Sequence, residues 1–454
     1  MKPQVIALAG LLLFAAKTPA SGIGFGGVAT GGLGKPVFIV TTLRDQLSHG
    51  SCGAHHCSLR DALAACKVAG GGNVYFNGLS GNINISTGGG NLIWDCPNST
   101  IDGSTGANHG VQIVEGPATA VSDQFLLDAD NVIIRYMRFR CTHFSGDPSS
   151  PGCTGGSRNI LAILGGHKIW IDHCSFEWGT KMLGDIGDGP RATTDITYSN
   201  NIFAESLGPG AILIGAGATR VSLYRNAFIS NSGRQPDIIP HSVLFGVDTV
   251  VVELIENYYY NFITAVQPDA DDPKVLITAS LVGNVWQQGP YGIRSNERIP
   301  VLYRDQLNRG RVWIYLSNNH LLDGGFKWFE YGASDRSCDV AATEATPFRA
   351  CTWPANAPKG CDDLEKAPCG AFSREPPELN RYPVLSTAGI KDAVLAAVGA
   401  SLPCRDALDA KVVADARSNG TEGAVLPLRA ATMPLPDLTA PCTTPMIHPG
   451  SLVR

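Results

Sequence analysis

The sequence predicts an all-β fold, a right-handed single-stranded parallel β-helix with an N-terminal helical cap and a disulfide-stapled C-terminal wrap. This prediction depends on a short strand pattern that recurs through the middle of the chain and on an asparagine at one fixed position of its later copies. Of the 454 residues, 52 are Gly and 29 are Pro, so the chain is rich in turns. Hydrophobic residues make up 44% of it, which is enough for a large core and excludes global disorder.

The recurring pattern begins near residue 131. An alternating apolar strand is followed by a small or polar residue and, two positions later, by a large apolar one; the copies are Val132–Phe139, Ile169–Phe176, Ile196–Phe203, Val221–Phe228, Val251–Tyr259, Val275–Trp286 and Val312–Leu321. Their final residues are 25 to 37 positions apart. A period in this range indicates stacked supersecondary units. No helical period links the copies, which argues against helix-pair solenoids and βαβ units.

An asparagine stands two residues before the large residue in five of the copies: Asn201, Asn226, Asn257, Asn284 and Asn319. A side-chain amide both donates and accepts, so identical Asn residues on successive coils can bond along a stack. Propeller blades of about 40–45 residues also fit the spacing, but the fixed Asn favours the β-helix. Constant strands with variable loops would then place function on the loops.

The flanking segments predict the ends of the β-helix. Leu59–Cys66 is expected to form a short amphipathic helix begun by Ser58, and such a cap covers the open end of a stacked sheet. We expect the first strands at Val74–Phe76 and Ile83–Ile85. Beyond about residue 325 the pattern stops, and one short helix is expected at Lys391–Ala400.

Three parts are therefore expected. Residues 1–20 are interpreted as a signal peptide, because Lys2 precedes an apolar run of 12 residues, Val5–Ala16, that is followed by small residues. The run is shorter than the roughly 20 residues that span a bilayer. Residues 21–325 form the β-helix domain, and 326–454 form a Cys/Pro-rich extension that packs on it. We accordingly expect a secreted, extracellular protein.

The 13 cysteines fit an exported chain, in which disulfides are expected. None forms a CxxC pair, so zinc-ribbon and thioredoxin readings lack their signature. Cys141 with Cys153 and Cys361 with Cys369 would close short loops, but the pairing cannot be deduced from sequence. The odd count leaves at least one thiol free, and Cys174 is the expected one because it falls in a buried strand copy.

The net charge of −5 and the pI near 6.1 argue against a nucleic-acid partner or an anionic membrane surface. We therefore expect neither of these partners, and we expect a monomer.

Several strings, in order along nearly the whole mature chain, resemble those of one enzyme family: CSLRDALA at Cys57–Ala64, IDGS at Ile101–Ser104, IWIDHCS at Ile169–Ser175, RQP at Arg234–Pro236, YNF at Tyr260–Phe262 and the segment Pro403–Arg417. Together they resemble the pectate lyase superfamily, specifically polysaccharide lyase family 1. The resemblance implies a right-handed parallel β-helix. It also implies cleavage of the α-1,4 bond of galacturonan by β-elimination, which leaves a 4,5-unsaturated end.

That chemistry explains which residue types the family needs. A base removes the C5 proton, which lies α to the uronate carboxyl group, and cations stabilise the negative charge that develops there. The resemblance places Arg234 at the position of the family base. Calcium, bound through oxygen ligands, is the cofactor that the resemblance implies.

The other site positions depart from the family pattern. Two substrate-binding cations of the family fall on Gly210 and Ile239. The calcium-ligand positions fall on Asn159, Lys181 and Asp185, of which only Asp185 is acidic. Asp185 and Asn159 alone form a poor calcium site, and the ammonium group of Lys181 would repel the ion. Lys181 is instead expected to hold the uronate, as in calcium-free pectin lyases of the same superfamily.

Three functions remain open. The first is an exported lyase acting on pectate or pectin, an acidic plant-type polysaccharide, with Arg234 as its base. The alternative is a non-catalytic β-helix protein that binds acidic polysaccharide. A glycoside hydrolase needs paired carboxylates, and the strings NTD and GHG of such enzymes on this fold are absent. We interpret Asp172 and His173 as structural, since strand alternation would send their side chains to opposite faces.

Overall fold

The computed structural model describes residues 22–47, 52, 56–85, 91–115, 123–141, 159–290, 299–303, 310–322, 329–331, 336–337, 339–340, 351–352, 385, 387–420 and 435–442. The expected signal peptide lies outside these residues. The division of the chain into three parts therefore stays a prediction.

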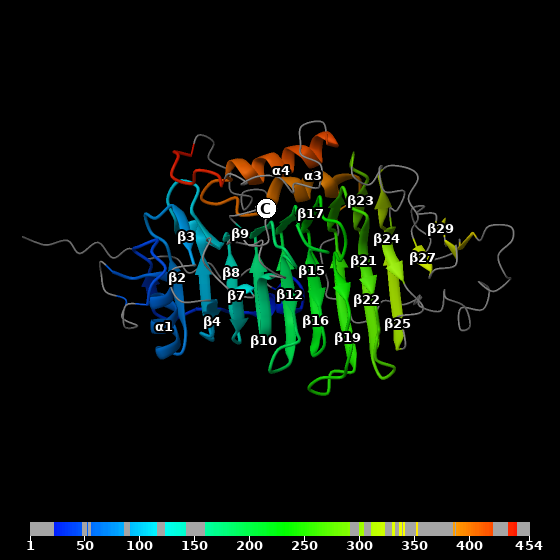
Figure 1. Cartoon of the computed structure of the whole chain (residues 1–454), viewed down its shortest axis with the longest axis horizontal. Helices are drawn as coiled ribbons and strands as arrows, with labels where there is room; N and C mark the ends of the chain where they lie inside the picture. Colours follow the sequence, from blue (N-terminus) through cyan, green and yellow to red (C-terminus); the bar gives the residue numbers. More distant parts are fainter. Residues whose placement is uncertain are drawn as a thin grey trace, which may run out of the picture.

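The chain winds into a right-handed parallel β-helix, which confirms the fold class predicted from the repeat. Figure 1 shows the strands stacked side by side along the long axis of the molecule. Each strand pairs in parallel with its equivalents in the coils before and after it; Phe176, for example, lies opposite Phe139 on one side and Phe203 on the other. The right-handed turn is the one that parallel crossovers of L-residues adopt.

The coils present three strand faces. Face 1 consists of β4 (Leu92–Trp94), β7 (Asp123–Asp128), the first half of β10 (Asn159–Asp172), β12 (Gly184–Ile186), β15 (Ile212–Ile214), β18 (Asp237–Ile238), β21 (Thr264–Pro268), β24 (Ile299–Tyr303) and β27 (Phe329–Tyr331). Face 2 consists of β1 (Val37–Ile39), β2 (Gly72–Tyr75), β5 (Ser99–Asp102), β8 (Val132–Arg135), the second half of β10, β13 (Thr193–Ser199), β16 (Ala218–Tyr224), β19 (Thr249–Ile255), β22 (Leu276–Val282) and β25 (Arg311–Ser317).

Face 3 consists of shorter strands: β3 (Gly81–Asn84), β6 (Val111–Glu115), β9 (Arg138–Cys141), β11 (Ser175–Glu177), β14 (Ile202–Ala204), β17 (Ala227–Ile229), β20 (Tyr258–Tyr260), β23 (Val285–Gln287) and β26 (His320–Leu321). The short pairings outside the three faces are antiparallel. They join β27 to β28 (Arg336–Ser337) and β29 (Asp339–Val340) to β30 (Cys351–Thr352). The described residues also form two 3₁₀ turns, η1 (Phe25–Val28) and η2 (Gly103–Thr105).

Each recurring sequence copy is a corner between face 2 and face 3, not one continuous strand. The residue before the Asn position has a positive φ in successive coils: Tyr136, His173, Asn200, Arg225, Glu256, Gly283 and Asn318. This left-handed residue breaks the strand and turns the chain. Strand alternation consequently holds only up to the corner.

The Asn ladder predicted from the sequence is confirmed. The side chain of Asn226 donates from Nδ2 to Oδ1 of Asn257 at 3.1 Å, and Asn257 repeats this bond to Asn284 at 3.0 Å. The same oxygens accept the backbone N–H of the preceding coil. Cys174 occupies the ladder position one coil before Asn201, and its thiol is free and buried, as expected.

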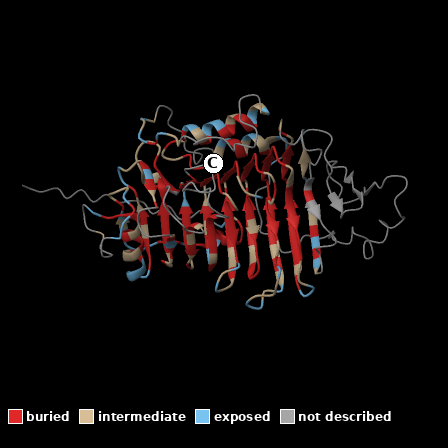
Figure 2. Cartoon of the chain, viewed as in Figure 1, coloured by how far each residue is buried: buried red, intermediate tan, exposed pale blue. Residues whose placement is uncertain are grey.

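The large residues that end the copies stack inside the coil. Phe139, Phe176, Phe203, Phe228, Tyr259 and Trp286 form a continuous column with ring centroids 4.8–5.2 Å apart. This is close to the spacing of neighbouring strands, roughly 4.7–4.9 Å. Figure 2 shows the resulting buried residues, in red, running the length of the strands.

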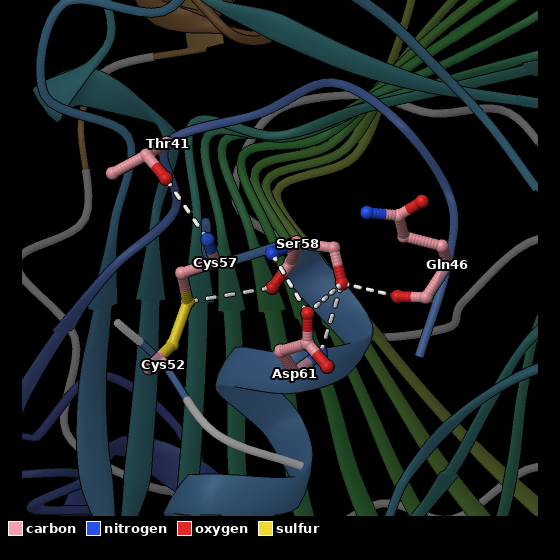
Figure 3. Close-up of a disulfide and its surroundings, with 6 residues drawn as sticks. All are labelled: Thr41, Gln46, Cys52, Cys57, Ser58 and Asp61. Carbon is pink, nitrogen blue, oxygen red and sulfur yellow. Dashed lines mark hydrogen bonds between the residues drawn. A yellow bond between two sulfur atoms is a disulfide. The ribbon is translucent and has the colours of Figure 1, made fainter. Parts of the chain in front are cut away.

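The expected N-terminal cap is present as α1 (Leu59–Val68). Ser58 begins the helix, because its hydroxyl accepts from the N–H of Asp61 while the Asp61 carboxylate accepts from the N–H of Ser58 (Figure 3). A disulfide joins Cys57 to Cys52, and another joins Cys66 to Cys96. The chain enters the sheet earlier than expected, because β1 already pairs with β2.

Two helices, not the single one expected, cover face 3: α3 (Thr387–Ala397) and α4 (Ala407–Ser418), which lie above β17 and β23 in Figure 1. Their apolar residues, including Val394 and Val412, pack on Tyr258 and its neighbours. A disulfide between Cys404 and Cys442 staples this wrap. No helix in the described ranges is long and apolar enough to cross a membrane.

A buried ion network fixes α4 to face 3. Arg140 contacts the carboxylates of Glu177, Asp406 and Asp409, and Arg138 contacts Asp406. Charges removed from water this far must be paired, since an unpaired buried charge is strongly destabilising.

Of the cysteine pairs that would close short loops, Cys141 is disulfide-bonded, whereas Cys153, Cys361 and Cys369 lie outside the described residues.

Asn257→Ala should destabilise the protein more than Asn319→Ala. Asn257 is fully buried, and its loss leaves the N–H of Asn226 and the carbonyl of Leu223 without partners. Each buried unsatisfied group costs about 1–3 kcal/mol. Asn319 is half-buried at the end of the ladder, where water can replace it. Urea unfolding of both variants measures the difference, and equal losses would contradict the claim that burial determines how much each ladder asparagine contributes to stability.

Candidate functional site

The predicted site residues lie on face 1 and in the turns that lead onto it from face 3: Asn159 and Asp185 stand in the face 1 strands β10 and β12. Lys181 lies in the turn between β11 and β12, and Arg234 lies in the equivalent turn between β17 and β18. Asp185 is in register with Leu213, which is in register with Asp237. The two turns are therefore two coils apart, or about 10 Å at the strand spacing of a sheet.

Asp185, Asn159 and Lys181 form one cluster. The side chain of Asn159 donates from Nδ2 to Oδ2 of Asp185 at 2.8 Å, and Nζ of Lys181 lies 3.8 Å from the same oxygen. The carboxylate of Asp185 is nearly buried, whereas the Lys181 side chain is 41% exposed. The fold therefore brings together three predicted residues from two strands and one turn. The ammonium group of Lys181 faces solvent beside the buried carboxylate of Asp185.

Burial raises the pKa of Asp185 to about 6. Lys181 and the hydrogen bond from Asn159 act in the opposite direction, while the carboxylates of Asp188 and Asp123 raise the pKa further. Sequence reasoning did not single out Asp123 or Asp188. Asp188 could have been found, since it follows Asp185 by three residues in the turn after β12.

The cluster does not fit calcium. Calcium takes six to eight oxygen ligands, and this cluster offers one carboxylate and one amide beside a lysine. Among the described residues, no group of three or more His, Cys, Asp or Glu side chains could hold a metal ion. Oδ1 of Asn159 and Oδ1 of Asp185 are buried without hydrogen-bond partners among the described residues, but the ammonium group of Lys181 already lies 3.8 Å from the Asp185 carboxylate and would repel a metal ion there. Calcium is not confirmed as a cofactor.

Arg234 is held by its own turn. Its backbone carbonyl accepts from the N–H groups of Ala211 and Ile212 at 3.1 and 2.9 Å. Its Nε lies 3.1 Å from Oδ2 of Asp237, whose carboxylate is buried, while the Arg234 side chain is 34% exposed. Asp237, which the sequence left unassigned, thus orients Arg234 toward the surface of face 1.

Gly210 explains one departure from the family pattern. A Cβ atom at this position would collide with the Cβ of Arg234 and with the carbonyl oxygen of Gly233. The turn therefore accommodates Arg234 in its present position only because residue 210 has no side chain. The lysine expected at 210 from the resemblance and this placement of Arg234 are mutually exclusive.

His241 lies at the opposite end of β18, where its Nε2 is 3.4 Å from Oδ1 of Asp188. Phe245, 52% exposed, lies in the turn that follows. Face 1 thus carries exposed cations at its entry, Lys181 and Arg234, and a histidine and an aromatic ring at its exit.

Asp172 and His173 do not diverge as strand alternation predicted. His173 has a φ of 50° at the corner, and its Nδ1 lies 2.7 Å from Oδ2 of Asp172. Asp172 also accepts from Ser199 and Asn200. The pair lies at the corner between face 2 and face 3, remote from the turn that carries Arg234.

No family model matches the chain. Among curated proteins, it is similar to "Probable pectate lyase C" of Aspergillus fumigatus, with 27% identity over 410 residues that cover 89% of this chain and 77% of the relative. The protein of the same name from Neosartorya fischeri is 26% identical over the same shares of the two chains. These relatives confirm the resemblance to pectate lyases that the sequence motifs indicated.

Solved structures with similar chains include "Structure of the thermostable pectate lyase PL 47", with a TM-score of 0.49, 16% identity, and coverage of 83% of this chain and 96% of that one. "Pectate lyase bound to hexasaccharide" has a TM-score of 0.48 and 16% identity, with 85% and 98% covered. The fold of this chain follows from its own strand pairings.

Proposed function

We propose that this chain is an exported polysaccharide lyase that cleaves α-1,4-linked galacturonan, as pectate or pectin, by β-elimination. The observation that carries the proposal is Arg234, which the sequence resemblance puts at the family's base position and which lies partly exposed in the turn onto face 1, oriented by the buried carboxylate of Asp237. The curated relatives named pectate lyase support the same reaction class.

In the proposed reaction, Arg234 takes the proton from C5 of a uronosyl unit. The electron pair forms the C4–C5 double bond, the C4–O4 bond breaks, and the leaving oxygen takes a proton from water. A guanidinium is protonated in free solution, so the substrate complex must favour its neutral form. The pairing with Asp237 acts against this form, which makes neighbouring positive charge a requirement of the mechanism.

Lys181 is proposed to hold a uronate carboxylate of the substrate in place of a metal ion. Its ammonium group is exposed two coils from Arg234 on the same face. That separation, about 10 Å, spans roughly two sugar units, so Lys181 would hold a uronate close to the one that reacts. Asn159 and Asp185 would position Lys181.

The alternative function is a non-catalytic β-helix protein that binds acidic polysaccharide. The glycine at 210 and the isoleucine at 239 favour it, because both positions lack the cation that the resemblance implies. Binding alone would still use Lys181 and Arg234.

Arg234→Ala should lower the rate at which 4,5-unsaturated product forms by 100-fold or more, because the loss of a proton-transfer group costs a factor of about 10²–10⁴. The rate is followed by ultraviolet absorbance on polygalacturonate and on methylated pectin. Arg234→Lys keeps a cation beside Asp237 and should lose activity with little change in Tm. Arg311→Ala removes an exposed arginine of β25 and serves as the matched control. An Ala variant with full activity would exclude Arg234 as the base.

Asp185→Asn should stabilise the protein at high pH and do so less as the pH falls. The pKa of Asp185 is raised in the folded chain from 3.8 to about 6, so the cost of ionising it in the folded state grows as the pH rises from 3.8 to 6 and is complete above pH 6. This penalty is small at pH 4 and disappears below 3.8, where both states hold the proton. Two pKa units correspond to about 3 kcal/mol at pH 8. Unfolding of the variant and of an Asp248→Asn control, measured from pH 4 to 8, tests this, and a variant less stable than the parent at pH 8 would contradict the burial of a charged Asp185.

A further inference from the structure

A cavity of about 560 Å³ lies between α3 and α4, on the helical wrap that covers face 3. Leu395 and Ala396 line it from α3, Val413 and Ala414 line it from α4, and two arginines, Arg405 and Arg417, complete the wall. Its size is within the range of about 300–1,000 Å³ that is typical of small-molecule sites. The cavity lies on another face of the coil than Lys181 and Arg234.

The two arginines have more donors than partners. Nη2 of Arg405 donates to the carbonyl of Ala396 at 3.5 Å, and Nη2 of Arg417 donates to that of Leu395 at 3.3 Å. Both therefore bind the C-terminal end of α3, where cations are favourable. A guanidinium has five N–H donors, and Nη1 of Arg405 is buried with no hydrogen-bond partner among the described residues. Capping α3 leaves that donor unexplained.

The surrounding charge also indicates a missing anion. The carboxylates that act on Arg405, Asp406 and Asp409, are already bound to Arg138 and Arg140. Burial lowers the pKa of Arg405, and the positive charge of Arg417 lowers it further, although Asp409 and Asp406 raise it. Two adjacent guanidinium groups on a chain of net charge −5 thus line one cavity, and within the described part of the chain neither has an ion pair with a carboxylate.

We infer that this cavity is a second saccharide-binding site, in which Arg405 and Arg417 hold the carboxylate of a uronosyl unit while its sugar ring packs on Ala396 and Ala414, the lining residues whose side chains remain accessible. Arginine pairs carboxylates bidentately, and a pyranose ring has apolar C–H faces that suit aliphatic walls. The choice of uronate as the sugar rests on the proposed function. The site would tether the acidic polymer away from the groove in which it is cut.

The test is isothermal titration of the full chain with trigalacturonate in a Lys181→Ala/Arg234→Ala background, which removes the face 1 cations. We expect one bound trisaccharide per chain. Adding Arg405→Gln/Arg417→Gln should weaken binding at least tenfold, whereas the exposed pair Lys35→Gln/Lys67→Gln, with the same change in charge, should not. Ala414→Trp fills the cavity while keeping both arginines, and it should also block binding. This second variant tests the inference even if Arg405→Gln/Arg417→Gln does not fold.

Three outcomes would overturn the inference: no binding in the silenced background, binding unaffected by the Gln and Trp variants, or equal binding of the neutral trisaccharide maltotriose. Displacement of trigalacturonate by inorganic phosphate of equal affinity would assign a general anion site and overturn the uronate choice. The result is separable from the proposed function, because Arg405→Gln/Arg417→Gln with native Lys181 and Arg234 should still release unsaturated product from short oligomers.

Discussion

The rest of the structure depends on the requirement that every coil turn at the same phase. A parallel β-helix stacks its strands at about 4.8 Å, so a side chain at the corner meets the same side chain of the next coil. Asn meets this requirement because its amide donates and accepts at once, and the ladder from Asn201 to Asn319 satisfies backbone groups that the corner leaves unpaired. The aromatic column from Phe139 to Trp286 fills the interior at the same spacing.

This stacking also determines where a functional site can form. Outward-facing residues at one register position line up along face 1, so Asp185 and Asp237 are separated by a fixed number of coils, whatever the lengths of the intervening turns. The turns then supply Lys181 and Arg234 above these carboxylates. Two buried carboxylates, each beside an exposed cation, suit a polyanionic chain that lies across the coils.

The repeat, the Asn phase, the capped helix α1 and the free Cys174 could be predicted because each follows from local pattern. The corners could not be predicted, since a left-handed backbone conformation such as that of His173 is compatible with many sequences. This conformation places the His173 ring against Asp172, which strand alternation did not predict. The sequence did not predict helix α4, because it is held by ion pairs between residues that are distant in sequence. These pairs join Arg138 and Arg140 to Asp406 and Asp409. The pairing of Arg234 with Asp237 and the space left by Gly210 likewise required coordinates.

The central claim is that Arg234 and Lys181 perform β-elimination without a metal ion. The most direct measurement is the ultraviolet absorbance of unsaturated ends released from polygalacturonate and from methylated pectin by the purified full chain, in EDTA and in added calcium. The account predicts product from at least one polymer at the same rate in both conditions. Product that disappears in EDTA would contradict the role of Lys181, and no product from either polymer with folded protein would contradict the lyase.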